Sequence, residues 1–235
     1  MPGPRIIVAL DFADAGAAQA FVQRVTPAQC RLKVGMELFT AAGPALVERL
    51  VSAGFDVFLD LKYHDIPTTV ARACTRAADL GVWMLNVHAL GGMRMLLAAR
   101  EAIENSKHRP LLIGVTLLTS HAEEELAQIG LERGAGRQVE RLAGMVRDAG
   151  LNGVVCSPAE ASLLRQRFGK DFVLVTPGVR QAGDAADDQR RTRTPAEAVS
   201  EGADYLVIGR PVTRAPDPAA VLGAINREIR EKDSR

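Results

Sequence analysis

The sequence predicts a single (β/α)8 barrel of the α/β class, with parallel strands inside a ring of helices, over residues 1–235. Short apolar runs alternate with longer segments rich in Ala, Leu, Arg and Glu from one end of the chain to the other. Near-continuous apolar strands that alternate with helices are typical of a parallel sheet covered by helices. The count of eight such units favours a closed barrel over an open sheet.

Eight runs have the length and composition of buried strands. In chain order they cover residues 5–11, 31–36, 56–62, 83–89, 110–118, 153–157, 172–178 and 205–209. The clearest helical segments lie between them, at residues 15–25, 43–54, 92–104 and 135–150. Several of these segments end at a glycine, as helices commonly do. Neither a linker nor a break in composition divides the chain, which predicts one domain.

Composition excludes several classes of protein. The 29 basic and 28 acidic residues nearly cancel and form no long like-charged block, so we expect no nucleic-acid partner. No run approaches the ~20 apolar residues of a membrane span, and we expect a cytoplasmic protein. Cys30, Cys74 and Cys156 lie far apart in apolar or helical surroundings, which predicts buried free thiols in a reducing compartment. Metal-ligand spacing is not recognisable, and we expect no metal.

Charged residues end the third predicted strand, DVFLDLK at residues 56–62. Because side chains alternate along a strand, Phe58, Asp60 and Lys62 share one face, which we expect to face the barrel interior. The opposite face, from Val57 to Leu61, is apolar and should meet the helices. Active sites of (β/α)8 barrels lie at the carboxyl ends of the strands, where Asp60 and Lys62 would project.

Neighbouring strands repeat this construction. Asp11 follows the first strand and Lys33 lies within the second, so four charges of alternating sign should meet at one rim. Such an array lets each buried charge compensate its neighbours. A lysine between carboxylates is stabilised in its charged form, which favours Lys62 as a proton donor over a Schiff-base nucleophile. A purely structural charged layer is the alternative.

Asp65 and the histidines near it allow more than one interpretation. HDIPTT at residues 64–69 resembles a helix start, with Asp65 near the N-cap and Pro67 in the first turn, so helix capping is an alternative to a functional role. His64 is more consistent with packing or support than with a general base. His88 could line the barrel mouth, although structure is its simpler role.

Two segments near the carboxyl end indicate a phosphate site. TPGVR follows the seventh strand and IGRPVT spans the end of the eighth, and loops at these places form a recurrent phosphate site in barrels. Gly209 would let backbone amides approach an anion, and Arg210 can hold phosphate with a fork of donors. The loop at 180–194 is long for its place, and such loops are usually functional or disordered.

These residues together resemble the orotidine 5′-phosphate decarboxylase family. The matching motifs, which run in family order from residue 9 to residue 213, are ALD (9–11), LKVG (32–35), DLKYHDIPTT (60–69), LLTS (117–120), TPGVR (176–180) and IGRPVT (208–213). The resemblance implies cofactor-free decarboxylation of orotidine 5′-monophosphate to uridine 5′-monophosphate, a step of pyrimidine biosynthesis. It also implies a homodimer with its sites at the subunit interface.

The resemblance further implies a role for each matching residue. Lys62 would protonate C6 of the pyrimidine, and Asp60 would lie against the substrate carboxylate. Lys33 and Asp11 would contact the ribose, and Asp65 with Thr69 would reach the partner's site. The remaining substrate-binding positions would be Thr119 near the pyrimidine, with Ser120 able to share its role, and Arg180, Gln189, Gly209 and Arg210 at the phosphate end. Gln189 lies where we expect variation within the family.

Two alternative functions remain open at this point. Proteins resembling 3-keto-gulonate-6-phosphate decarboxylase or hexulose-6-phosphate synthase also carry an Asp-x-Lys-x-x-Asp segment, and those enzymes use magnesium and a sugar phosphate. Lys33 in LKVG and the Ile-Pro-x-Thr after Asp65 favour the nucleotide enzyme instead. A catalytically silent barrel that binds a nucleotide phosphate is the second alternative. The cost of retaining the buried charges argues against it.

Overall fold

Eight parallel strands close into one barrel in the computed structural model, which describes residues 3–118, 123–131, 134–179 and 193–233. The strands are β1 (Ile6–Ala9), β2 (Arg31–Gly35), β3 (Val57–Tyr63), β4 (Met84–His88), β5 (Leu111–Val115), β6 (Gly153–Val155), β7 (Val173–Pro177) and β8 (Tyr205–Ile208). Each strand pairs with the next along the chain, and β8 pairs with β1. The predicted (β/α)8 barrel and its eight strands are confirmed.

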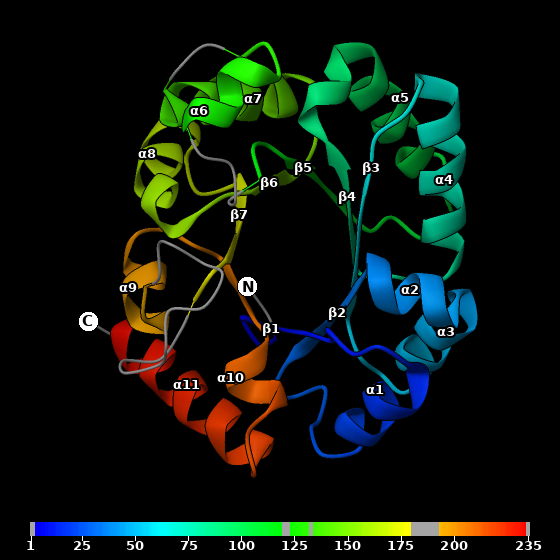
Figure 1. Cartoon of the computed structure of the whole chain (residues 1–235), viewed down its shortest axis with the longest axis vertical. Helices are drawn as coiled ribbons and strands as arrows, with labels where there is room; N and C mark the ends of the chain where they lie inside the picture. The colour runs from blue at the N-terminus through cyan, green and yellow to red at the C-terminus, as the bar shows by residue number, and fades with distance from the viewer. Residues whose placement is uncertain (1–2, 119–122, 132–133, 180–192, 234–235) are drawn as a thin grey trace.

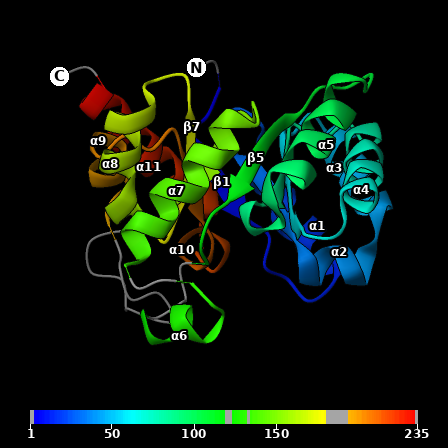
Figure 2. The ribbon, with the colours of Figure 1, turned by 90° about the horizontal axis from the view of Figure 1, so that it is seen from above.

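Helices surround the strands on all sides (Figure 1). They are α1 (Ala15–Val22), α2 (Met36–Ala42), α3 (Pro44–Ser52), α4 (Pro67–Asp79), the 3₁₀ helix η1 (Ala89–Gly91), α5 (Gly92–Glu104), α6 (Glu123–Gln128), α7 (Ala135–Asp148), α8 (Pro158–Phe168), α9 (Pro195–Ser200), α10 (Arg210–Thr213) and α11 (Pro218–Asp233). Within the described ranges, none of these helices combines the length and the apolar character needed to cross a membrane. Figure 2 shows α6 clear of the helical ring at the end of the barrel where α10 also lies. Because α10 follows β8 directly, this end is the carboxyl-terminal mouth.

Side-chain alternation along the strands separates two packed layers. Val57 and Leu59 of β3 pack in the layer between strands and helices, whereas Phe58 faces the barrel interior, as predicted. The interior layer consists of the buried residues Ile7, Phe58, Met84, Ile113, Val173, Val175 and Tyr205. Each large apolar side chain buried in this way stabilises the fold by roughly 1.5–3 kcal/mol. The barrel interior is therefore a packed core and not a pore.

An arginine closes the amino-terminal end of the barrel. The guanidinium carbon of Arg31 lies 4.3 Å from the ring centroid of Trp83 and 4.9 Å from that of Tyr205. Its Nε donates to Oδ2 of Asp56 at 3.0 Å, so the buried charge is compensated. Cation–π contacts of this kind contribute about 0.5–2 kcal/mol each. Since aromatic rings and a paired cation fill this end, a ligand would enter from the carboxyl-terminal mouth.

The three cysteines are free and buried, as predicted. Burial raises the pKa of the Cys30, Cys74 and Cys156 thiols from an ordinary value of 9.0 to about 12 in each case. The folded protein therefore keeps these thiols protonated at pH values where an unfolded chain would lose their protons.

We expect the free energy of unfolding to fall as the pH rises from about 9 towards 12. Each thiol binds its proton more tightly in the folded state, so it contributes stability that is present below pH 9 and lost above it, by about 1.4 kcal/mol per pH unit. Urea unfolding at neutral pH and at about pH 10 measures the effect. Cys74→Ala should show a shallower alkaline decline than the parent protein. A free energy of unfolding that does not change over this range would contradict the prediction.

Candidate active site

The charged end of β3 leaves the regular strand geometry. Asp60 and Lys62 both line a cavity at the carboxyl-terminal mouth, on the same face as Phe58. Lys62 has φ of +52°, the one positive φ of a non-glycine residue within the described part of the chain. A left-handed conformation costs such a residue roughly 1–3 kcal/mol and is most often found at functional sites. The surrounding structure must therefore hold Lys62 in this conformation.

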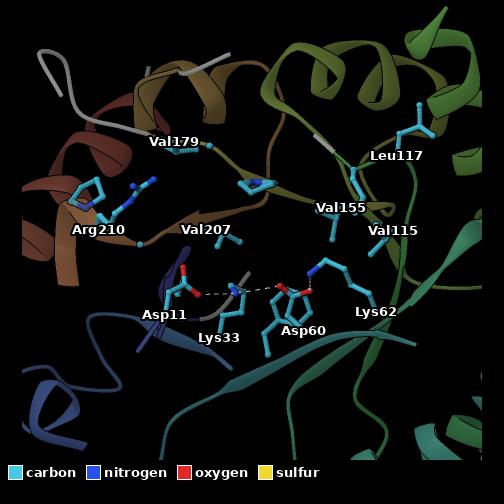
Figure 3. Close-up of a pocket in the computed structure, with 17 residues that line it drawn as sticks. Asp11, Lys33, Asp60, Lys62, Val115, Leu117, Val155, Val179, Val207 and Arg210 are labelled. Carbon is cyan, nitrogen blue, oxygen red and sulfur yellow. Dashed lines mark hydrogen bonds and ion pairs between the residues drawn. The ribbon is translucent and has the colours of Figure 1, made fainter. Parts of the chain in front are cut away.

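Ion pairs join the four predicted charges in one row (Figure 3). Nζ of Lys62 lies 2.8 Å from Oδ1 of Asp60, and Nζ of Lys33 lies 3.3 Å from Oδ2 of the same carboxylate. Lys33 also approaches Oδ1 of Asp11 at 3.5 Å. Asp60 is only 8% exposed, so its charge depends on the two flanking lysines. The four charges of alternating sign therefore meet at this mouth, as the sequence predicts.

Asn86 of β4 is a part of this cluster that the sequence analysis missed. Its Nδ2 donates to Oδ1 of Asp60 at 2.7 Å, and its Oδ1 accepts the backbone N–H of Lys62 at 2.8 Å. The residue is fully buried. One signal was available in the sequence, because an amide side chain on the inward face of an otherwise apolar strand needs buried polar partners.

The row of charges forms one side of a cavity of about 290 Å³. This volume is close to the lower end of the range for small-molecule sites. An apolar wall faces the charges and includes Val115, Leu117, Val155 and Val207. Figure 3 shows Lys62 beside this wall and Arg210 at the other side of the cavity, with Lys33 and Asp60 between them. A ligand that fills the cavity would meet apolar atoms, both signs of charge and an arginine in succession.

The predicted phosphate end takes its lining from two loops. Gly178 and Val179 follow β7, and Gly209 and Arg210 follow β8, and all four residues line the cavity. Gly209 precedes the first residue of α10, with φ of −106° and ψ of −106°. The structure thus brings the loops after strands seven and eight together at the place where barrels commonly bind phosphate.

Asp65 and Thr69 do not line this cavity in their own chain, within the residues that the structure describes. Both are exposed, and Oδ1 of Asp65 accepts the N–H of the next residue, Ile66, at 2.6 Å. Helix α4 begins at Pro67 with Ile66 as its N-cap, and that cap has no side-chain hydrogen bond. Asp65 therefore lies near the N-cap and Pro67 in the first turn, as predicted, but the Asp65 side chain does not cap the helix.

His64 and His88 stack on one another, with ring centroids 5.2 Å apart and planes inclined by 22°. Nδ1 of His88 also accepts the backbone N–H of Leu90 at 3.4 Å. This contact links the segment after β3 to the end of β4 and agrees with the packing role expected for both residues.

Four of the predicted positions lie outside the described residues. They are Thr119, Ser120, Arg180 and Gln189. In the part of the chain that the structure does describe, no group of three or more His, Cys, Asp or Glu side chains is arranged to hold a metal ion.

The fold and the site define a class of protein. A closed (β/α)8 barrel with charged residues converging on a cavity at its carboxyl-terminal mouth has the architecture of the TIM-barrel enzymes. The family model described as "Orotidine 5'-phosphate decarboxylase / HUMPS family" matches residues 4–225. The chain belongs to this family, and the resemblance found in the sequence motifs is confirmed.

Individual relatives agree over almost the whole chain. The orotidine 5'-phosphate decarboxylase of Nitrosospira multiformis is 58% identical over 231 residues, which cover 98% of this chain and 96% of the relative. That of Laribacter hongkongensis is 62% identical over 221 residues, covering 94% and 91%. The crystal structure of orotidine 5'-phosphate decarboxylase from Lactobacillus acidophilus is similar with a TM-score of 0.86 at 37% identity, over 95% of this chain and 98% of the other.

Proposed function

We propose that this chain is an orotidine 5′-phosphate decarboxylase, a carboxy-lyase that converts orotidine 5′-monophosphate to uridine 5′-monophosphate and CO2. The observation that carries the proposal is the row Asp11–Lys33–Asp60–Lys62 along one side of the cavity, with Arg210 at the far side. The family to which the chain belongs and the names of its relatives support the same activity.

Lys62 supplies the proton in the proposed reaction. The bond between C6 and the carboxylate carbon breaks, CO2 leaves, and the electron pair stays on C6. An N–H bond of the Lys62 ammonium then breaks as C6 takes its proton, which leaves a neutral amine that regains a proton from water. The ammonium, already 2.8 Å from one carboxylate, also stabilises the negative charge that develops on C6. The residues named here account for the reaction without a cofactor or metal.

Asp60 contributes by repelling the substrate's carboxylate. At ~4 Å and an effective dielectric constant near 20, two like charges repel by about 4 kcal/mol. If the departure of CO2 relieved all of this repulsion, the rate would rise by roughly three decades. Since that term is insufficient for a slow decarboxylation, stabilisation by Lys62 must supply much of the remainder.

The rest of the nucleotide extends from Lys62 towards Arg210. Lys33 and Asp11 lie between Asp60 and Arg210, where they are suited to the ribose hydroxyls (Figure 3). Backbone amides at Gly209 and the guanidinium of Arg210 bind the phosphate in this proposal. Thr119 near the pyrimidine, with Arg180 and Gln189 at the phosphate, completes the proposed substrate contacts.

A homodimer would explain the exposed segment after β3. Ile66 is 65% exposed, although it is a large apolar residue, and Asp65 and Thr69 beside it are exposed as well. We propose that this segment packs against a second copy of the chain, with Asp65 and Thr69 reaching the partner's cavity. An isologous interface of this kind would complete both sites at once.

We expect purified protein to consume orotidine 5′-monophosphate in an absorbance assay, at the same rate with and without a chelator. Lys62→Ala should abolish turnover and leave the melting temperature nearly unchanged, because Asp60 remains paired with Lys33 and Asn86. Chelator-sensitive activity on a sugar phosphate instead would indicate the magnesium-dependent alternative. No loss of either substrate would favour a silent binder, and a rate in Lys62→Ala equal to the parent's would refute the role of this lysine.

Arg210→Ala should lower kcat/KM by about 10- to 100-fold, since a hydrogen bond to a charged group contributes about 1.5–3 kcal/mol. Both a higher KM and a lower kcat are expected, because phosphate binding energy can be used at the reacting carbon. Arg214→Ala is the matched control, as this exposed arginine caps the same short helix. Equal steady-state constants for the two variants would contradict the assignment.

Mixing two inactive variants tests the proposed dimer. In a hybrid of Lys62→Ala and Asp65→Ala subunits, one site carries both changes and the other carries neither. If subunits exchange freely, the mixture should recover about a quarter of the parent's activity per site, because half of the dimers are hybrids with one intact site. Refolding the variants together and assaying the mixture measures this recovery. Activity that stays at the level of the separate variants, in a mixture that mass spectrometry shows to contain hybrids, would argue against a shared site.

A further inference from the structure

Strand β3 contains more residues than its neighbour at the point where the charges lie. Leu59 pairs with Leu85 and Tyr63 pairs with Val87, so residues 60–62 of β3 lie opposite the single residue Asn86 of β4. An insertion of this kind interrupts the ladder of backbone hydrogen bonds and redirects the side chains around it. Inserted residues lose their regular backbone partners and need substitutes.

The side chain of Asn86 provides such substitutes. Its carbonyl oxygen accepts the N–H of Lys62 at 2.8 Å, in place of a backbone carbonyl. Its amide nitrogen donates to Oδ1 of Asp60 at 2.7 Å, the same oxygen that Lys62 approaches. One buried amide thus contacts both residues to which the proposed reaction assigns the chemistry, through a donor and an acceptor in fixed relation.

Both contacts restrain a geometry that would otherwise relax. Lys62 has φ of +52°, which a residue with a side chain adopts only when its surroundings hold it there. Lys33 contacts Oδ2 of Asp60, and both Lys62 and Asn86 contact Oδ1. Rotation of the carboxylate would therefore break at least one of these contacts. Removal of Asn86 would leave the N–H of Lys62 without this acceptor and take away one of the three contacts that hold the Asp60 carboxylate.

We infer that Asn86 is a positioning residue, which fixes the Lys62 ammonium and the Asp60 carboxylate against the reacting carbon without itself touching substrate. The inference rests on the proposed function. By this inference, the side chain of Asn86 on the neighbouring strand holds the strained backbone of Lys62 in place. A hydrophobic residue of the same size would fill the space, but the N–H of Lys62 would lose this acceptor and Asp60 would lose this donor. Misplacement of a reacting group by ~1 Å costs about 100-fold in rate.

Asn86→Leu should lower kcat by about 100-fold. KM for orotidine 5′-monophosphate and Kd for uridine 5′-monophosphate should stay within about threefold of the parent, because the phosphate end lies across the cavity. Asn86→Asp is a second variant of nearly the same size. It keeps an acceptor for the Lys62 N–H but puts an oxygen where the donor to Asp60 was, and the same division between kcat and binding is expected.

Thr116→Val is the matched control. Thr116 is as fully buried as Asn86, but its hydroxyl donates to the carbonyl of Val155 and not to the row of charges. Its kcat should stay within about threefold of the parent's. Crystal structures of the parent and Asn86→Leu proteins should show the Lys62 ammonium displaced from Asp60 in the variant alone.

The inference is overturned if both Asn86 variants retain the kcat of the control, or if their affinity for uridine 5′-monophosphate falls as far as kcat, since general damage to the cavity would do that. A parent protein that leaves orotidine 5′-monophosphate intact would instead refute the proposed function. In that case the crystal structures decide about Asn86, because an unmoved Lys62 and Asp60 in the variant would show that Asn86 does not position them.

Discussion

The site depends on the pairing of the Asp60 carboxylate with lysines on both sides. A carboxylate that is 8% exposed would be strongly destabilised without compensation, and Lys33 and Lys62 each lie within 3.3 Å of one of its oxygens. This pairing fixes the relative places of β2 and β3 at the mouth and keeps both ammonium groups beside the cavity. The same charges that need one another for burial therefore also form the chemical surface of the site.

The barrel brings the paired side chains of β2 and β3 close together. Adjacent parallel strands bring their carboxyl ends to one rim, so residues more than 20 positions apart in sequence, such as Lys33 and Asp60, meet without a long loop. At the opposite end, Arg31 and its aromatic neighbours close the interior. The packed layer that includes Phe58 lies between the two ends, so the charges lie on a rigid base, as a site that must hold its geometry requires.

Most of the fold and the charged part of the site could be predicted from the sequence, because both follow from local patterns. Apolar runs give the eight strands, and a period of two places Asp60 and Lys62 inward. The insertion in β3 and the particular partners of Asn86 could not be predicted in this way, since they arise from the register between β3 and β4. The exact start of α4 after its Ile66 cap could not be predicted either, because sequence signals for helix starts are accurate only to a few residues.

The two lysines of the row also have different surroundings. Lys33 bridges two carboxylates, those of Asp11 and Asp60, and its side chain is 12% exposed. Lys62 contacts Asp60 alone among these carboxylates, and 27% of its side chain is exposed. The Lys33 ammonium thus compensates two carboxylates at once, whereas the one carboxylate beside Lys62 is also paired with Lys33 and bonded to Asn86. This difference agrees with the proposed roles, because Lys33 holds the row of charges together, whereas Lys62 has its backbone in a strained conformation beside the apolar wall of the cavity.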